Sequence, residues 1–162
     1  MTQKNTITLF KSIAVVGSGQ MGQGIAQVCA AAGFQVSLID ISAEQLTKAE
    51  KSIHKILDRQ IEKGRLTAAD KTATLNNLTF TQSLTSPDVD LLIEAVTENL
   101  SLKTSLMKQY DSFLKPEAIL ASNTSSISIT QLAAVTKRPS QVIGMHFMNP
   151  VQSCLWWKLF GG

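Results

Sequence analysis

Features typical of several other protein classes are missing from this 162-residue sequence. It has no apolar run near the ~18–20 residues that a membrane-spanning helix needs, so we expect no membrane contact. Its two cysteines, Cys29 and Cys154, are too few for a disulfide framework. They indicate a reducing compartment and a cytoplasmic location. The residues before the first strand pattern include Lys4 and Lys11 but no arginine, unlike an organelle signal.

Charged residues are also few. Charged residues make up 17% of the chain, the net charge is +3, and the lysines are scattered. We therefore expect no nucleic-acid surface, and we expect no metal site. A hydrophobic content of 44% at this length is typical of one globular domain that builds a core without disulfides.

The sequence does contain an alternation of strand and helix patterns. Short apolar runs predict strands at residues 12–16, 34–39, 78–81, 90–96, 118–122 and 141–147. Helices are predicted at residues 21–32, from a cap at Ser42 to Gly64, after a cap at Thr67, and at residues 100–114 and 129–137. This order predicts an α/β fold of the Rossmann type. Its doubly wound, mostly parallel sheet has helices on both faces. The sheet is also expected to be incomplete at the C-terminal edge, for a reason that depends on a family resemblance given below.

A GxGxxG motif formed by Gly17, Gly19 and Gly22 separates the first strand from its helix. The motif alone is weak, because such triplets occur by chance. Between a strand and a helix, however, the first glycine makes the tight turn, the second lets a pyrophosphate approach, and the third allows close packing. Free N–H groups at Gln20 and Met21 would then face the phosphates.

Asp40 lies 18 residues beyond Gly22, at the end of the second predicted strand. A carboxylate there accepts hydrogen bonds from the adenosine ribose and repels a 2′-phosphate. The sequence therefore predicts NAD as the cofactor, in preference to NADP. The plainer alternative is a glycine turn next to a surface aspartate.

Polar side chains also follow three later strands, in residues 94–100, 122–126 and 146–150. Ligands bind at the carboxyl ends of strands in open α/β sheets, so these segments can meet in one crevice. His146 is the natural proton acceptor of this set, although it can equally be a structural histidine. The serine cluster can cap the next helix, with or without a functional role.

The stretches VVGSGQMGQGIAQVCAAAGFQVSLID, LLIEAVTENLSLK, ASNTSSISITQLA and RPSQVIGMHFMNP carry a family resemblance. Over about residues 13–150 the sequence resembles the L-3-hydroxyacyl-CoA dehydrogenase family, which includes bacterial 3-hydroxybutyryl-CoA dehydrogenases. The resemblance implies NAD-dependent interconversion of (S)-3-hydroxyacyl-CoA and 3-ketoacyl-CoA in fatty acid β-oxidation. It also implies an acyl-CoA substrate and a homodimeric parent enzyme.

The same resemblance implies roles for individual residues. His146 matches the general base that takes the proton from the 3-hydroxyl group, and Ser125 matches the serine that hydrogen-bonds the reacting oxygen. Asn149 matches an asparagine beside cofactor and substrate. The expected cofactor contacts are Gly17, Gly19, Gln20, Met21, Gly22, Asp40, Ala95, Glu98, Lys103, Ser125 and Asn149. Glu98 and Lys103 match residues on the nicotinamide side. Lys63 falls where the family can meet CoA, or is simply a solvated lysine.

The last residues depart from the family pattern. Family members continue with Val-Pro-Val-Met and then a glutamate that pairs with the histidine, whereas Lys158 stands 12 residues beyond His146 here. We expect residues 1–150 to form the NAD-binding domain, residues 151–162 to be an aberrant tail, and the C-terminal helical domain to be absent. Such a chain should be inactive alone. Its unpaired strand edge and apolar tail also predict self-association.

Two explanations compete for this tail: a divergent C-terminus, or a reading-frame shift just after Val151. Codon overlap favours the shift. Tryptophan is encoded only by TGG and lysine codons begin with AA, so the overlapping triplet across Trp157 and Lys158 is GAA, glutamate. With permitted codons elsewhere, that frame can read Pro-Val-Met-Pro-Leu-Val-Glu-Ile-Ile-Arg-Gly.

Two other functions stay open. One is a non-catalytic dinucleotide-binding fragment, and the other is a different two-domain NAD dehydrogenase acting on a short hydroxy acid. Turnover of acetoacetyl-CoA with NADH would separate the first of these from the family's activity.

Overall fold

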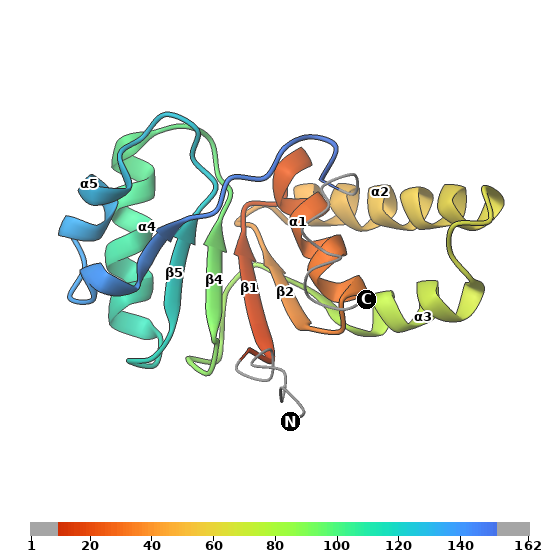
Figure 1. Ribbon diagram of the computed structural model, residues 1–162, viewed down its shortest axis with the longest axis horizontal. Coiled ribbons are helices and arrows are strands. Elements are labelled where there is room, and N and C mark those ends of the chain that lie inside the picture. Colours follow the sequence, from red (N-terminus) through yellow and green to blue (C-terminus); the bar gives the residue numbers. More distant parts are fainter. Residues whose placement is uncertain (1–9, 152–162) are drawn as a thin grey trace, which may run out of the picture.

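The structure, a computed structural model, describes residues 10–151 and contains one six-stranded sheet. Its strands are β1 (Ser12–Val16), β2 (Gln35–Ile39), β3 (Leu78–Thr81), β4 (Leu91–Glu94), β5 (Ile119–Ser122) and β6 (Val142–Gly144). They lie in the order β3-β2-β1-β4-β5-β6, and each neighbouring pair is parallel (Figure 1). The order turns back between β1 and β4, which makes that point the topological switch of a doubly wound sheet.

Helices cover both faces of the sheet, as predicted. Helices α1 (Gln20–Ala31), α2 (Ala43–Glu62) and α3 (Ala68–Asn76) lie on one side in Figure 1, and α4 (Leu100–Phe113) and α5 (Ile129–Ala134) lie on the other. The two faces have separate cores. Ile13 and Val15 of β1 belong to one core, and Ala14 and Val16 belong to the other. A strand with both faces buried must be apolar throughout, as this one is.

The helix starts follow the capping signals in the sequence. The Ser42 side chain accepts from the backbone N–H of Gln45 at 3.2 Å at the start of α2. Thr67 and Asp70 form a complete capping box at the start of α3. The apolar stripe predicted for α2 is buried at Leu46, Ala49, Ile53 and Leu57.

Several predicted elements are shorter in the structure. The strand expected at residues 141–147 is only Val142–Gly144, because its partner β5 ends at Ser122. Residue Gln141 lies instead in a short 3₁₀ helix, Pro139–Gln141. The strand expected at 90–96 is Leu91–Glu94, and the helix expected at 129–137 ends at Ala134. As a result, His146 lies in a loop beyond the sheet and not on a strand.

The described chain ends inside the core. Val151 is only 2% exposed and packs in the core that contains α1 and α2. The predictions for Cys154, the tryptophans and Lys158 fall outside the described residues. No helix within residues 10–151 combines the length and apolar character that crossing a membrane requires.

Candidate functional site

The glycine loop between β1 and α1 is packed too tightly for side chains at two positions. Gly17 has a φ of +100°, and a Cβ there would lie 2.8 Å from the carbonyl oxygen of Ala95. A Cβ at Gly22 would lie 1.7 Å from the carbonyl oxygen of Gly17. The first and third glycines therefore make the turn and the close packing that the motif predicts.

Gly19 differs from the other two glycines because a Cβ there would meet nothing within 4 Å. Gly19 and Gln20 are exposed, while Met21 packs partly against the core. Within residues 10–151 no side chain caps the N-terminus of α1. The helix thus presents its first N–H groups and its positive dipole end to open space, as an anion site requires.

Asp40 follows β2 and is fixed to this loop by hydrogen bonds. Its Oδ2 accepts from the backbone N–H of Ser18 at 2.9 Å and from the Ser18 hydroxyl at 2.8 Å. Its Oδ1 accepts from the backbone N–H of Ser42 at 3.0 Å. Partial burial acts to raise the pKa of Asp40, but these bonds outweigh it and hold the pKa below its ordinary value. The carboxylate is therefore ionised near neutral pH. Ser18 was not among the predicted site residues, and its signal in the sequence is its place inside the glycine motif.

A hollow of about 290 Å³ lies beside Asp40 at the switch point of the sheet. Its walls come from the ends of β1 and β2, the turn after β4, and one side of α4. The lining includes Gly17, Asp40, Ile41, Val96, Leu102 and Leu106. Mostly apolar walls with a carboxylate at one end suit the adenosine half of a dinucleotide.

A second polar cluster lies at the ends of β4 and β5, around Glu98. Its Oε1 accepts from the hydroxyl of Thr124 at 2.5 Å and from the backbone N–H groups of Ser125 and Ser126 at 2.9 and 3.3 Å. Partial burial acts to raise the pKa of Glu98, but hydrogen bonds from Thr124, Ser125 and Lys103 lower the pKa to about 2. The structure thus brings together Glu98 and Ser125, two residues that the family resemblance includes among the cofactor contacts.

Lys103 lies beneath this cluster and is only 1% exposed. Its Nζ donates to Glu94 Oε1 at 2.7 Å and to the carbonyl oxygen of Val96 at 3.2 Å, and it lies 3.2 Å from Glu98 Oε2. A direct contact between Lys103 and a cofactor would need this side chain to shift. Glu94 begins the segment of residues 94–100 that was expected at the crevice, but it was not itself predicted as a site residue. Its signal was a carboxylate ending an otherwise apolar strand, a position that demands a buried partner.

The loop that carries His146 is held at the end of β5. The backbone N–H of Met145 donates to the carbonyl oxygen of Ser122 at 3.0 Å, and that of Phe147 donates to Asn123 Oδ1 at 2.8 Å. His146 is exposed between these two anchors. No carboxylate within residues 10–151 forms an ion pair with it. Asn149 is also exposed.

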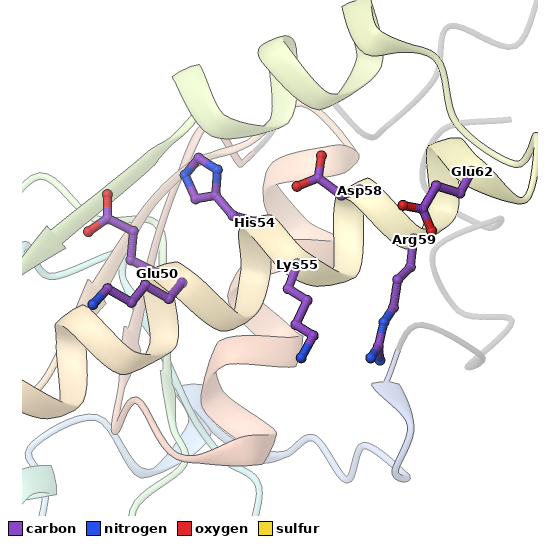
Figure 2. A pocket seen from close by; sticks show the side chains of 7 residues that line it. Glu50, His54, Lys55, Asp58, Arg59 and Glu62 are labelled. Atoms are coloured by element: carbon purple, nitrogen blue, oxygen red, sulfur yellow. The ribbon is translucent and has the colours of Figure 1, made fainter.

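A larger hollow, of about 630 Å³, runs along the outside of α2 (Figure 2). Its lining residues all come from that helix and carry both signs of charge: Glu50, Lys51, His54, Lys55, Asp58, Arg59 and Glu62. A single helix face cannot enclose a ligand, so this hollow is a solvated surface and not the site. Lys63, the exposed C-cap of α2, lies next to this face in the chain and is not part of the glycine loop or the Glu98 cluster.

Comparisons with known proteins agree with this geometry. Residues 12–155 match the family model described as 3-hydroxyacyl-CoA dehydrogenase, NAD binding domain. The chain is 46% identical over 144 residues to the 3-hydroxybutyryl-CoA dehydrogenase of Bradyrhizobium diazoefficiens, covering 88% of this chain and 49% of the relative. It is 46% identical over 141 residues to the 3-hydroxyadipyl-CoA dehydrogenase of Escherichia coli, covering 86% of this chain and 30% of the relative.

Solved structures share the fold. The crystal structure of (S)-3-hydroxybutyryl-CoA dehydrogenase from Ralstonia eutropha superimposes with a TM-score of 0.84 at 46% identity, covering 89% of this chain and 51% of that one. That of 3-hydroxybutyryl-CoA dehydrogenase from Escherichia coli gives a TM-score of 0.87 at 44% identity, covering 89% and 31%. The chain therefore spans about half the length, or less, of the relatives that it matches.

Proposed function

Since the chain belongs to the 3-hydroxyacyl-CoA dehydrogenase family and matches its NAD binding domain, we propose that it binds NAD at the carboxyl ends of its strands. Gly19 and the start of α1 bind the pyrophosphate. Asp40 binds the adenosine ribose, and the hollow beside it takes the adenine. The nicotinamide half extends past Ala95 toward Glu98, Ser125 and Asn149.

The observation that carries this proposal is the pairing of an open Gly19 with a fixed Asp40 across one hollow. Gly19 leaves room above free N–H groups, whereas Gly17 and Gly22 leave none for a side chain. Asp40 is ionised and already oriented by Ser18. A surface turn would need neither feature, because its glycines would only have to relieve backbone strain.

Calorimetric titration of the chain with NADH tests this proposal. We expect saturable binding with one NADH for each chain, and weaker binding of NADPH. A chain that is folded by circular dichroism but gives no heat and no saturation with NADH would contradict the proposal.

We further propose that the enzyme to which this chain corresponds interconverts (S)-3-hydroxyacyl-CoA and 3-ketoacyl-CoA in fatty acid metabolism. NAD supplies the hydride chemistry when bound. His146 takes the hydroxyl proton, Ser125 hydrogen-bonds the reacting oxygen, and Asn149 orients the substrate. Lys63 is proposed to meet the CoA moiety. A cytoplasmic location belongs to the same proposal, supported by Cys29, which is free and partly buried.

For the chain by itself, the alternative of a non-catalytic dinucleotide-binding fragment has one observation in its favour. His146 is exposed and has no carboxylate partner among residues 10–151. A histidine that must accept a proton is oriented and stabilised by such a partner. NADH binding without reduction of acetoacetyl-CoA would identify the chain as this fragment.

A further inference from the structure

The side chain of Glu94 is fully buried although it carries a carboxyl group. Glu94 is the last residue of β4, pairs with Val16 of β1 and Ser122 of β5, and is 0% exposed. Removing a carboxylate from water is costly unless the group is both paired and hydrogen-bonded. The contacts of Glu94 therefore show which parts of the structure the buried carboxylate holds in place.

Those contacts join three separate parts of the chain. Glu94 Oε1 accepts from the backbone N–H of Val96 at 2.7 Å and from Lys103 Nζ of α4 at 2.7 Å. Glu94 Oε2 accepts from the hydroxyl of Ser122, at the end of β5, at 2.6 Å. One carboxylate thus fixes the turn after β4, the first turns of α4, and the end of β5.

The network continues outward from Lys103 to the surface. The Lys103 ammonium also lies 3.2 Å from Glu98 Oε2. The other oxygen of Glu98 accepts from Thr124, Ser125 and Ser126. The buried charge at Glu94 is therefore connected, through Lys103 and Glu98, to the loop that carries Ser125.

We propose that Glu94 is a positioning residue of the dinucleotide site, which holds the Lys103 ammonium against Glu98 so that Glu98 fixes the loop of residues 124–126. This inference rests on the proposed function. Asp40 places the adenosine half of the cofactor at β1 and β2, so the nicotinamide half extends toward β4 and β5, where this loop lies. Glu94 touches no ligand itself and acts through Lys103 and Glu98.

The chain offers a matched control for a purely structural role. Asp111 of α4 has a side chain that is 4% exposed and pairs with Arg138 at 2.7 Å. Arg138 also donates to the carbonyl oxygen of Ala118, just before β5 begins, so this pair lies at the amino ends of the strands, opposite to the end where Glu94 lies. Both pairs are buried and both involve α4, but only the Glu94 pair leads to the Glu98 cluster.

The test compares Glu94→Gln with Asp111→Asn, because each change keeps the shape of the side chain and removes one buried charge. Both variants should unfold at a lower temperature than the parent chain. At a temperature where both are folded, the dissociation constant for NADH should rise ~10-fold in Glu94→Gln and less than ~2-fold in Asp111→Asn. In a Glu98→Gln background, Glu94→Gln should add little, because the two act through one network.

NMR spectroscopy reports on the loop of residues 124–126 without any ligand. The amide resonances of Ser125 and Ser126 report their hydrogen bonds to Glu98, so they should move in Glu94→Gln and stay in place in Asp111→Asn. If Glu94→Gln does not fold, Glu94→Asp keeps both charges and draws the carboxylate one methylene away from the Lys103 ammonium and the Ser122 hydroxyl. It should move the same resonances and weaken NADH binding ~3-fold.

The outcomes separate the inference from the proposed function. If the parent chain does not bind NADH, the proposed function fails. If the parent binds NADH and Glu94→Gln binds it equally well, or if Asp111→Asn loses as much affinity, Glu94 is only structural. Full additivity with Glu98→Gln would also overturn the inference, as would unmoved Ser125 and Ser126 resonances.

Discussion

At the residue scale, we propose that Asp40 has the largest part in the choice between NAD and NADP. Its carboxylate is held by Ser18 and Ser42 before any ligand arrives. A preorganised acceptor loses little entropy when it binds a ribose hydroxyl, and its charge repels a 2′-phosphate. Because the pKa of Asp40 lies below its ordinary value, this discrimination should persist well into the acidic range.

Asp40→Ala should weaken NADH binding ~10- to 100-fold, because hydrogen bonds to a charged acceptor are lost. Binding of NADPH should weaken less or improve, since the repulsion disappears. Calorimetric titration with both cofactors measures the change. Asp58→Ala, on the exposed side of α2, is the control and should leave both affinities unchanged. Equal affinities of the parent chain for NADH and NADPH would contradict the assignment of Asp40.

Two glycines of one motif should respond in opposite ways. Gly19→Val places a branched side chain in open space, so the fold should survive while the pyrophosphate is displaced and NADH binding is lost. Gly22→Ala puts a methyl group 1.7 Å from the carbonyl oxygen of Gly17. That overlap should lower the free energy of unfolding by at least ~1–3 kcal/mol. Urea denaturation together with NADH titration distinguishes the two effects. If a Gly19→Val chain still binds NADH, the loop is only a turn and does not bind the pyrophosphate.

At the scale of elements, the loop after β5 depends on one carboxylate. Glu98 accepts from Thr124, Ser125 and Ser126, and no other residue of the described chain provides so many acceptor contacts to this loop. The loop therefore has its order fixed by an ionised group on the turn before α4. Protonation of that group should loosen it.

This dependence predicts an acid-sensitive stability. The pKa of Glu98 is about 2 in the folded chain, below its ordinary value of 4.5. Its contribution to the free energy of unfolding is therefore complete above pH 4.5 and is lost as the pH falls toward 2. In Glu98→Gln, the free energy of unfolding should be lower than in the parent at neutral pH and should decline less steeply over that window.

Urea denaturation at several pH values gives the slope for each chain. Glu62→Gln, on the exposed face of α2, is the control and should keep the slope of the parent. The other carboxylates with lowered pKa values, Asp40, Asp70, Asp90 and Asp111, are present in all three chains. An identical slope in the parent and in Glu98→Gln would show that the loop does not depend on the charge of Glu98.

At the scale of the whole molecule, β6 forms the edge of the described sheet, and an unpaired edge invites association. We predict that the chain self-associates and that shortening its apolar tail relieves this. Because Val151 packs in the core, the chain should be shortened after residue 151, one residue later than the boundary expected from the sequence. Sedimentation of both chains at several concentrations measures the effect. A monomeric parent chain at high concentration would contradict the prediction.

A second prediction at this scale concerns catalysis. We propose that restoring the overlapping reading frame after Val151 returns a glutamate 12 residues beyond His146, where the sequence has Lys158. In the Ser-His-Asp triad, loss of the orienting carboxylate costs roughly 10⁴-fold in rate. Reduction of acetoacetyl-CoA by NADH should therefore be slow in the chain as given and restored in the frame-corrected protein.

Lys158→Glu alone should rescue little of this activity, because it restores one carboxylate and leaves the rest of residues 152–162 outside the family pattern. The three proteins are assayed side by side under the same conditions. Substantial turnover by the chain as given would contradict the frame-shift hypothesis. A lack of activity in the frame-corrected protein would contradict the proposed reaction.

The sequence by itself determined the parts of this protein that depend on local rules. Short apolar runs and period-3.6 patterns predicted the order of strands and helices, because both faces of a parallel sheet must be apolar and a helix needs one buried stripe. The helix caps at Ser42 and Thr67 and the glycine turn could also be predicted, because each depends only on a few neighbouring residues. The expected pairing of the glycine motif with Asp40 followed from its spacing and from the place of Asp40 at the end of the second predicted strand.

Only the tertiary structure decided the features that join distant segments. The end of β6, and hence the loop position of His146, depends on where β5 stops. The burial of Lys103 between Glu94 and Glu98 depends on how α4 packs against β4 and β5. Charges buried this way are paid for by several partners at once. Lys103 lies 9 residues from Glu94, but Ser122 lies 28 residues from it, and no local pattern names Ser122 as a partner. The structure therefore shows that Glu94 and Lys103 hold this cluster together, an arrangement that the sequence did not predict.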